Sequence, residues 1–243
     1  MEIKGVGLED VVAHVRAMEA ELDRRASGKF RRYFLDTGLY RRALYPKHID
    51  FFRAGAVHRE RAFIAANRVG KSDAGSFELS AHLTGQYPDW WEGRRFTEPI
   101  RAWACGDTSR TVRDIIQEKL VGGPGAYGTG MIPAETLIHR TSKPGIPDAI
   151  ESVWVRHASG GTSVLGLKTY AEGRESFQGT AQNCVWMDEE PDEGIYTEAL
   201  LRTMSCDGIV FCTLTPLRGL SPFILSFMPG GVMSEGTVQA ATP

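Results

Sequence analysis

The stretch that decides the fold is Arg61-Ala62-Phe63-Ile64-Ala65-Ala66-Asn67-Arg68-Val69-Gly70-Lys71-Ser72. A short apolar run with strand character leads into a turn that ends in Gly-Lys-Ser. In such a turn, successive backbone N–H groups point at a phosphate, the lysine reaches the β and γ phosphates, and the hydroxyl can bind Mg²⁺. The pattern therefore predicts a nucleotide-binding loop made of Ala66, Asn67, Arg68, Val69, Gly70, Lys71 and Ser72.

The loop departs from the full pattern at one position, because the pattern has glycine where this chain has Ala65. By average residue usage, Gly-Lys-Ser/Thr occurs by chance in roughly one chain in ten of this length. An ordinary strand-to-helix turn is therefore an alternative interpretation of the loop alone. Residues 73–83 contain helix formers and Gly85 can end a helix, so we expect a helix whose N-terminus faces the phosphates.

Composition places the chain among single α/β domains. It has 243 residues, 42% of them hydrophobic, which is enough to bury a sizeable core. No stretch approaches 18 consecutive apolar residues, and residues 1–10 lack the basic-then-apolar order of a signal peptide. We therefore expect a soluble protein of the cytosol.

Strand and helix patterns alternate along the chain, which predicts an α/β fold with a mainly parallel central sheet and helices on both faces. Further strands are expected at 100–106, 183–189 and 208–214, helices at 8–26, 110–120 and 195–206, and a hairpin at 152–157 and 162–170. Glycine and proline dominate residues 121–147, which predicts a long surface excursion there.

The strand at 183–189 ends in the carboxylates Asp188 and Glu189. Ligands of parallel sheets bind beyond the carboxyl ends of the strands, so this pair falls at the same edge as the Lys71 turn. Asp188 can then hold Mg²⁺ together with Ser72, and Glu189 can polarise an attacking water. The alternative, a solvated acidic helix start, leaves this agreement in position unexplained.

Residues 24–47 contain eight basic residues against one acid, Asp36, with aromatic residues between them. This composition suits a nucleic-acid backbone or a nucleotide lid. A solvated helix face with aromatic core anchors is an equally open interpretation.

Four segments, at 66–72, 172–180, 185–191 and 213–216, resemble in order and spacing the large terminase subunits of tailed bacteriophages. The resemblance covers about residues 45–220. It implies the ATPase domain of a viral DNA-packaging motor, a P-loop NTPase of the additional-strand, catalytic-glutamate class that uses ATP and Mg²⁺. It also implies double-stranded DNA, a viral portal protein and a small terminase subunit as partners, with no membrane. The chain would form a homo-oligomeric ring when assembled, with a monomer in isolation as the alternative, and its location would be the host cell cytoplasm.

The resemblance also implies roles for individual residues. Asp188 would be the magnesium-associated aspartate and Glu189 the catalytic carboxylate. Residues 213–216 resemble the motif that couples loss of the γ-phosphate to movement, with Thr215 favoured over Thr213.

Two arginines are candidates for stabilising the charge of the transition state. Arg174 resembles an arginine that reaches into the adjacent subunit, and Arg68 could act within its own subunit. We favour Arg174 and leave Arg68 open.

Members of this family often carry a glutamine that recognises adenine, at a position before the first strand. Here that neighbourhood has His48 and no glutamine. Tyr45 or Phe52 could stack on the base instead, although an aromatic residue there is more often part of the core. Adenine recognition is therefore left open, with Tyr45 and His48 as candidates.

The resemblance divides the chain into three parts. Residues 1–44 would form a helical, basic and lid-like extension, residues 45–220 the ATPase core, and residues 221–243, which lack Lys and Arg, a linker toward a nuclease domain absent from this chain. Nuclease activity is therefore not expected. Two other functions stay open, a helicase-like ATPase on single strands and a nucleotide-binding assembly module that does not hydrolyse.

Overall fold

The structure, a computed structural model, describes residues 12, 14–16, 18–19, 28–217 and 219–228. Most of the helix predicted at 8–26 lies outside the described residues, as do Arg24 and Arg25 of the basic segment and residues 229–243 of the predicted linker.

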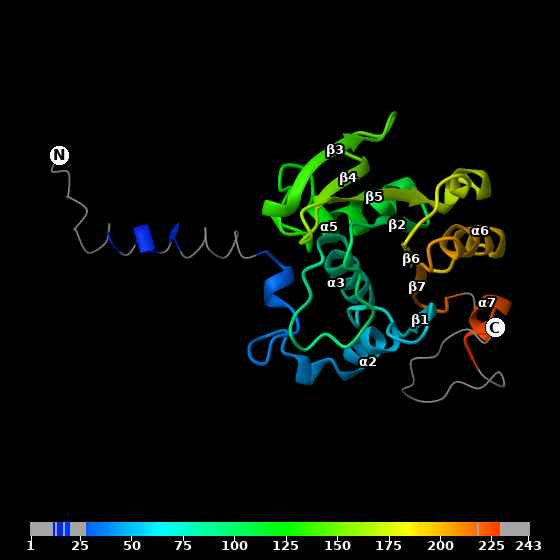
Figure 1. Ribbon diagram of the computed structural model, residues 1–243, viewed down its shortest axis with the longest axis horizontal. Coiled ribbons are helices and arrows are strands. Elements are labelled where there is room, and N and C mark those ends of the chain that lie inside the picture. The colour runs from blue at the N-terminus through cyan, green and yellow to red at the C-terminus, as the bar shows by residue number, and fades with distance from the viewer. Residues whose placement is uncertain (1–11, 13, 17, 20–27, 218, 229–243) are drawn as a thin grey trace, which may run out of the picture.

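The described residues form one seven-stranded sheet in the order β1-β7-β6-β2-β5-β4-β3 (Figure 1). The pairs from β1 through β7, β6 and β2 to β5 are parallel, whereas β4 and β3 extend the sheet antiparallel. This confirms the mainly parallel sheet. The strands are β1 Glu60–Ile64, β2 Arg101–Gly106, β3 Leu137–Ser142, β4 Ile150–Arg156, β5 Thr162–Thr169, β6 Cys184–Asp188 and β7 Ile209–Leu214.

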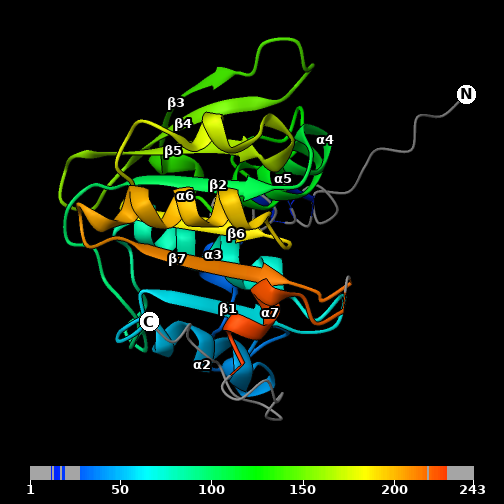
Figure 2. The ribbon, with the colours of Figure 1, turned by 90° about the vertical axis from the view of Figure 1, so that its right-hand side faces the viewer.

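Helices cover both faces of the sheet, as predicted. Figure 2 shows α6 crossing in front of the strands and α3 behind them, with the arrowheads of β2 and β7 pointing to one common edge. The α-helices are α2 Pro46–Ala54, α3 Lys71–Thr84, α4 Ser109–Thr111, α5 Glu118–Val121, α6 Glu193–Met204 and α7 Pro222–Ser226. The π-helix η3 Val112–Gln117 joins α4 to α5, and the 3₁₀ helices are η1 Phe30–Arg32, η2 Arg42–Leu44, η4 Ala134–Thr136, η5 Tyr170–Glu172 and η6 Arg174–Phe177.

Each face of the sheet has its own apolar core, because successive side chains of a strand point to opposite faces. On β6, Trp186 packs into the core that contains Phe77 of α3, while Val185 and Met187 pack into the core that contains Ile195 of α6. Burying both faces explains the nearly continuous apolar sequence of β6 and β7.

The ends of α3 follow from two glycines. Gly70 precedes the helix with φ 84° and Gly85 follows it with φ 67°, both in the left-handed region that glycine adopts without strain. The predicted stop at Gly85 is therefore confirmed. At the start of α4, the Thr108 side chain accepts a hydrogen bond from the Thr111 N–H and so caps the helix.

The prediction of a surface excursion over 121–147 is wrong in part, because β3 lies within it. This edge strand is mostly exposed on both faces, so its residues lack the alternation that marks a half-buried strand. Helix α7 was not predicted from the sequence either. Its Ile224 and the following Phe227 are buried on the α6 side of the sheet, in the first part of the segment assigned to a linker.

Within the described part of the basic segment, Phe30 and Phe34 belong to the core, Tyr33 and Tyr45 pack against it, and Tyr40 stacks on Tyr33. Phe30 stacks on Phe77 with ring centroids 4.5 Å apart, and Phe34 is 2% exposed. Arg31 pairs with Glu135 at the surface, 2.9 Å away. The aromatic pattern of this segment is therefore explained by packing.

None of the helices formed by the described residues is long and apolar enough to cross a membrane.

Candidate active site

The predicted loop connects β1 to α3 at the carboxyl edge of the sheet, where residues 66–69 are exposed. Arg68 has φ 64° and Gly70 has φ 84°, so the turn uses the left-handed conformation twice. A side chain at position 70 would place its Cβ 3.2 Å from His48 Nε2, in addition to the strain of its φ angle. Glycine at position 70 is therefore required by both the backbone and the packing.

Lys71 folds back over this loop and is 6% exposed. Its Nζ donates to the Ala66 carbonyl and to Thr215 Oγ1, both at 2.8 Å. Burial lowers the pKa of the ammonium, and the carboxylates of Glu189 and Asp188 oppose this shift. Both hydrogen-bond acceptors are neutral, so the charge of Lys71 remains available to an anion in the loop.

Asp188 ends β6 opposite Thr213 of β7 in the parallel register, so the two side chains lie side by side on one face. Thr213 Oγ1 donates to Asp188 Oδ1 at 2.6 Å, and Ser72 Oγ lies 2.8 Å from Oδ1 and 3.1 Å from Oδ2. Asp188 is 6% exposed, and burial raises its pKa to about 6, with hydrogen bonds from Thr213 and Ser72 opposing the shift.

The Ser72 hydroxyl and the Asp188 carboxylate fit a magnesium ion. They are hard oxygen donors, the ligand type that Mg²⁺ prefers, and they lie 2.8 Å apart. The described residues include no group of three or more His, Cys, Asp or Glu side chains that could hold a metal. A Mg²⁺ site needs few protein ligands, because this ion takes most of its ligands from water and substrate phosphates.

Glu189 has φ 69°, a conformation that costs a residue other than glycine on the order of 1–3 kcal/mol. Its N–H donates to the Thr213 carbonyl at 2.9 Å, and the Tyr170 hydroxyl donates to the Glu189 carbonyl at 3.2 Å. These contacts fix the strained backbone. They turn the carboxylate toward β7, where the Thr215 N–H lies 3.4 Å from Oε2.

Thr215 connects the loop to the acidic strand end. Its hydroxyl accepts from Lys71 Nζ and donates to Asn67 Oδ1 at 2.8 Å, while its N–H faces Glu189. Thr213 contacts Asp188 instead. The two threonines therefore occupy different parts of the site, with Thr215 beside Lys71 and Asn67 and Thr213 beside Asp188.

The two candidate arginines lie apart from each other. Arg68 is on the exposed loop itself. Arg174 is on η6, and its Nε donates to Glu198 Oε2 of α6 at 3.1 Å while 58% of its side chain is exposed. In this structure Arg174 is thus paired within its own chain, outside the cluster around Lys71.

The aromatic candidates for base recognition differ in burial. Phe52 is 1% exposed and packs against Phe34 and Phe77, so its ring has no face for a base and this suggestion is wrong. His48 is 6% exposed beneath Gly70, and burial lowers its pKa. Tyr45 is half-buried against the His48 ring and keeps part of its surface open.

Two residues of the site were missed from the sequence. The Tyr170 hydroxyl supports the backbone of Asp188 and Glu189, and the Trp186 indole N–H donates to Thr213 Oγ1 at 2.7 Å. Strand periodicity contained a signal for Trp186, because residues two apart on a strand share a face and Trp186 precedes Asp188 by two. Tyr170 carried no comparable signal.

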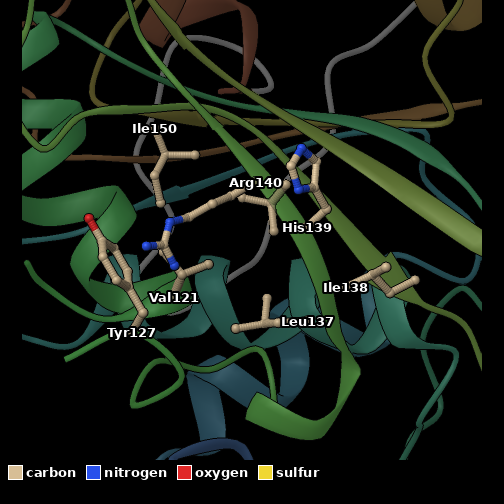
Figure 3. A pocket seen from close by; sticks show the side chains of 8 residues that line it. Val121, Tyr127, Leu137, Ile138, His139, Arg140 and Ile150 are labelled. Atoms are coloured by element: carbon tan, nitrogen blue, oxygen red, sulfur yellow. The ribbon is translucent and has the colours of Figure 1, made fainter. Parts of the chain in front are cut away.

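A separate hollow lies at the other end of the sheet, under the β3 edge (Figure 3). Its volume is about 120 Å³, with Val121, Leu137, Ile150 and Val153 among its lining residues. The Arg140 guanidinium stacks on Tyr127, 3.7 Å from the ring centroid. The hollow shares no residue with the Lys71 loop.

The fold and the site together define a class of protein. A phosphate-binding loop follows β1, a carboxylate pair follows β6, and β7 is inserted between these two strands. This arrangement is that of a P-loop NTPase of the additional-strand, catalytic-glutamate class. The chain belongs to the family described as terminase large subunit, T4likevirus-type, N-terminal, whose sequence profile matches residues 62–239.

Relatives agree with this assignment. The large terminase subunit of Salmonella phage P22 is 36% identical over an alignment of 221 residues, and the match covers 83% of this chain and 44% of that protein. The chain therefore spans less than half the length of this relative.

Solved structures with a similar fold include the large terminase ATPase domain of Thermus phage P74-26, at 19% identity and a TM-score of 0.46 over 76% of this chain and 73% of that one. A large terminase from a thermophilic bacteriophage, solved in complex with ADP, has 13% identity and a TM-score of 0.45 over 70% of this chain and 37% of that one.

Proposed function

We propose that this chain is the ATP-hydrolysing motor domain of a viral large terminase, which powers translocation of double-stranded DNA into procapsids. The observation that carries the proposal is the connected site at one sheet edge, in which Lys71, Asp188 and Glu189 are joined through Thr213 and Thr215. Membership in the terminase family supports the same conclusion.

In the proposed mechanism, the N–H groups of residues 66–72 and the Lys71 ammonium hold the phosphates of ATP. Lys71 exchanges its neutral partners, the Ala66 carbonyl and the Thr215 hydroxyl, for phosphate oxygens. Glu189 orients the attacking water and acts as the general base that accepts its proton. Ser72 and Asp188 would hold Mg²⁺, which when bound neutralises charge that develops on the phosphates.

Thr215 is the proposed coupling residue. When Lys71 turns to the phosphates, the Thr215 hydroxyl loses a donor, while its N–H still faces Glu189. Loss of the γ-phosphate would let Lys71 return. The position of Thr215 thus depends on the nucleotide state, which is the property a coupling residue needs.

The wider setting belongs to the proposal as well. It comprises an oligomeric ring, the portal protein and the small terminase subunit as partners, and the host cytoplasm as location. We retain the division into an extension at 1–44, a core at 45–220 and a linker from 221, whose first turns pack on the core as α7.

Replacing Glu189 by glutamine tests the hydrolytic role. Glu189→Gln should bind nucleotide normally and lose turnover by about 100-fold or more, because the amide cannot act as a base. Glu190→Gln is the matched control, since Glu190 contacts Ser221 and should keep its turnover. Binding is measured by calorimetry and turnover by phosphate release, and normal turnover of Glu189→Gln would refute its catalytic role.

The trans role of Arg174 is tested by mixing inactive variants. Arg174→Ala alone and Lys71→Ala alone should be inactive in assembled rings, whereas mixed rings should regain part of the activity. No recovery on mixing would argue against a trans arginine. Comparing stimulation by double-stranded and single-stranded DNA separates a packaging motor from a helicase-like enzyme.

A further inference from the structure

The Trp186 side chain is fully buried, and it carries a hydrogen bond of fixed direction. An indole N–H can only donate, so Thr213 Oγ1 is the acceptor in this 2.7 Å contact. An ionised carboxylate can only accept, so the same hydroxyl donates to Asp188 Oδ1 at 2.6 Å. The hydroxyl of Thr213 therefore has no freedom to rotate while both partners are in place.

Helix α3 holds the indole in position. A Cβ at Gly75 would lie 2.4 Å from Trp186 Nε1, so the helix backbone approaches the edge of the ring that carries the N–H. The same helix begins with Lys71 and supplies Ser72, which contacts Asp188 from the other side. The Asp188 carboxylate is thus held between Ser72 of α3 and Thr213 of β7, and the Trp186 indole donates to the Thr213 hydroxyl.

We infer that Trp186 is a positioning residue for the nucleotide-associated metal, because its N–H orients the Thr213 hydroxyl and thereby the Asp188 carboxylate. The inference rests on the proposed function. It gives Thr213 a role on the metal side of the site, distinct from the coupling role of Thr215.

A core residue without this role would affect stability alone. Trp186 also packs in the core on the α3 side, so loss of the ring would disturb folding. The distinguishing property is a loss of affinity that appears only when Mg²⁺ is present. A test must therefore remove the N–H, keep a ring, and compare binding with and without the metal.

The experiment measures the Kd of ADP by titration calorimetry in Mg²⁺ and in EDTA. Trp186→Phe should weaken binding in Mg²⁺ by about 5-fold, the factor that corresponds to one hydrogen bond of about 1 kcal/mol, and leave binding in EDTA unchanged. Thr213→Val should weaken ADP binding in Mg²⁺ at least as much, whereas Thr213→Ser, which keeps the hydroxyl, should bind ADP as wild type does. Trp103→Phe is the matched control, because Trp103 is a buried tryptophan on neighbouring β2 that packs on Phe177.

Two further variants keep the test decisive. Replacing Trp186 by β-(3-benzothienyl)alanine removes the N–H and keeps the bicyclic shape, so it repeats the measurement without a cavity. In the double variant of Trp186→Phe and Thr213→Val, the two losses should not add, because both remove the same link.

Three results would overturn the inference. Both position-186 variants could bind ADP in Mg²⁺ as tightly as wild type does, or they could lose as much affinity for ADP in EDTA as in Mg²⁺. In the double variant, the two losses of affinity could add. If wild type itself gains no affinity from Mg²⁺, the proposed function fails together with the inference. If wild type gains affinity and the position-186 variants match it, the inference alone fails.

Discussion

Two clusters in this domain share one design and differ in burial. In the inner cluster, Glu78 of α3 lies between Arg61 and His82, with its Oε1 2.6 Å from Arg61 Nη2 and 3.2 Å from His82 Nε2. In the outer cluster, Glu198 of α6 lies between Arg174 and Arg202, with contacts of 3.1 and 2.9 Å. Each glutamate is shared by two basic side chains.

The difference lies in access to water. Both Arg61 and Glu78 have 0% exposure, whereas Arg174 is 58% exposed. A charge pair without access to water cannot separate, because each ion would be left unsolvated. Glu198 is only 3% exposed, but it keeps Arg202 at 2.9 Å when Arg174 leaves, and water solvates the exposed Arg174. The ion pair of the inner cluster therefore stays formed in the folded protein, whereas Arg174 of the outer cluster can exchange Glu198 for another partner.

The inner cluster joins three elements. Arg61 of β1 also donates to the Phe51 carbonyl of α2 at 2.7 Å and lies over the Phe51 ring. Gly55 makes room for the guanidinium, because a Cβ there would lie 2.9 Å from Arg61 Cζ. Although burial alone would raise it, Arg61 and His82 hold the pKa of Glu78 below its usual value.

The same substitution in both clusters gives the sharpest comparison. Glu78→Gln should lower the free energy of unfolding by about 3–5 kcal/mol, because it leaves the Arg61 charge buried and uncompensated. Urea unfolding followed by circular dichroism measures the loss. Replacing both partners, as Glu78→Gln with Arg61→Met, should cost less than the single change, and a loss below about 1 kcal/mol in the single variant would contradict a buried ion pair.

Lowering the pH should have the second largest effect, because it reduces the stability that depends on His82 of the inner cluster. Burial is the main cause of the lowered pKa of His82, so the unfolded state takes up a proton below about pH 6.5 that folded His82 does not. Stability from this group is present above that pH. It is lost as the pH falls below about 6.5, by at most about 1.4 kcal/mol per pH unit.

Urea midpoints between pH 8 and pH 5.5 measure this dependence. His82→Gln should reduce the slope, and His48 and His157, whose pKa values are also lowered by burial, should retain part of it. Replacing the exposed His58 by glutamine is the control. An unchanged slope in His82→Gln would show that the inner cluster does not sense acid.

Glu198→Gln should cost at most about 1 kcal/mol, because the Arg174 side chain is 58% exposed and that of Arg202 26% exposed, so both can turn to water when Glu198 loses its charge. The same unfolding assay applies. A loss of unfolding free energy as large as that of Glu78→Gln would show that the outer ion pairs also stay formed.

Salt should have the smallest effect. At about 1 M salt the Debye length is about 3 Å, so the difference between wild type and Glu198→Gln should shrink by a few tenths of a kcal/mol, while that of Glu78→Gln stays constant. Unfolding at low and high salt tests this, and an equal salt response in both variants would remove the distinction between the clusters.

Sequence alone predicted the features that depend on short spacing. The loop at 66–72, the start of α3 and the strand ending in Asp188-Glu189 each need particular residues at fixed separations. It could not predict that Arg61 finds Glu78, or Arg174 finds Glu198, because those pairs form only when separate elements pack. Strand β3 was missed because an exposed edge needs no apolar alternation.

The placement of β7 has a consequence for how the domain can move. This strand is hydrogen-bonded to β1 on one side and to β6 on the other, so it cannot shift sideways without breaking both ladders. If Thr215 is the coupling residue as proposed, a change in nucleotide state that reaches it would pass along the chain, into the segment after Leu214 that ends in α7 on the α6 side of the sheet. In the proposed motor, the sheet would stay fixed while the movement followed the direction of β7 toward α7.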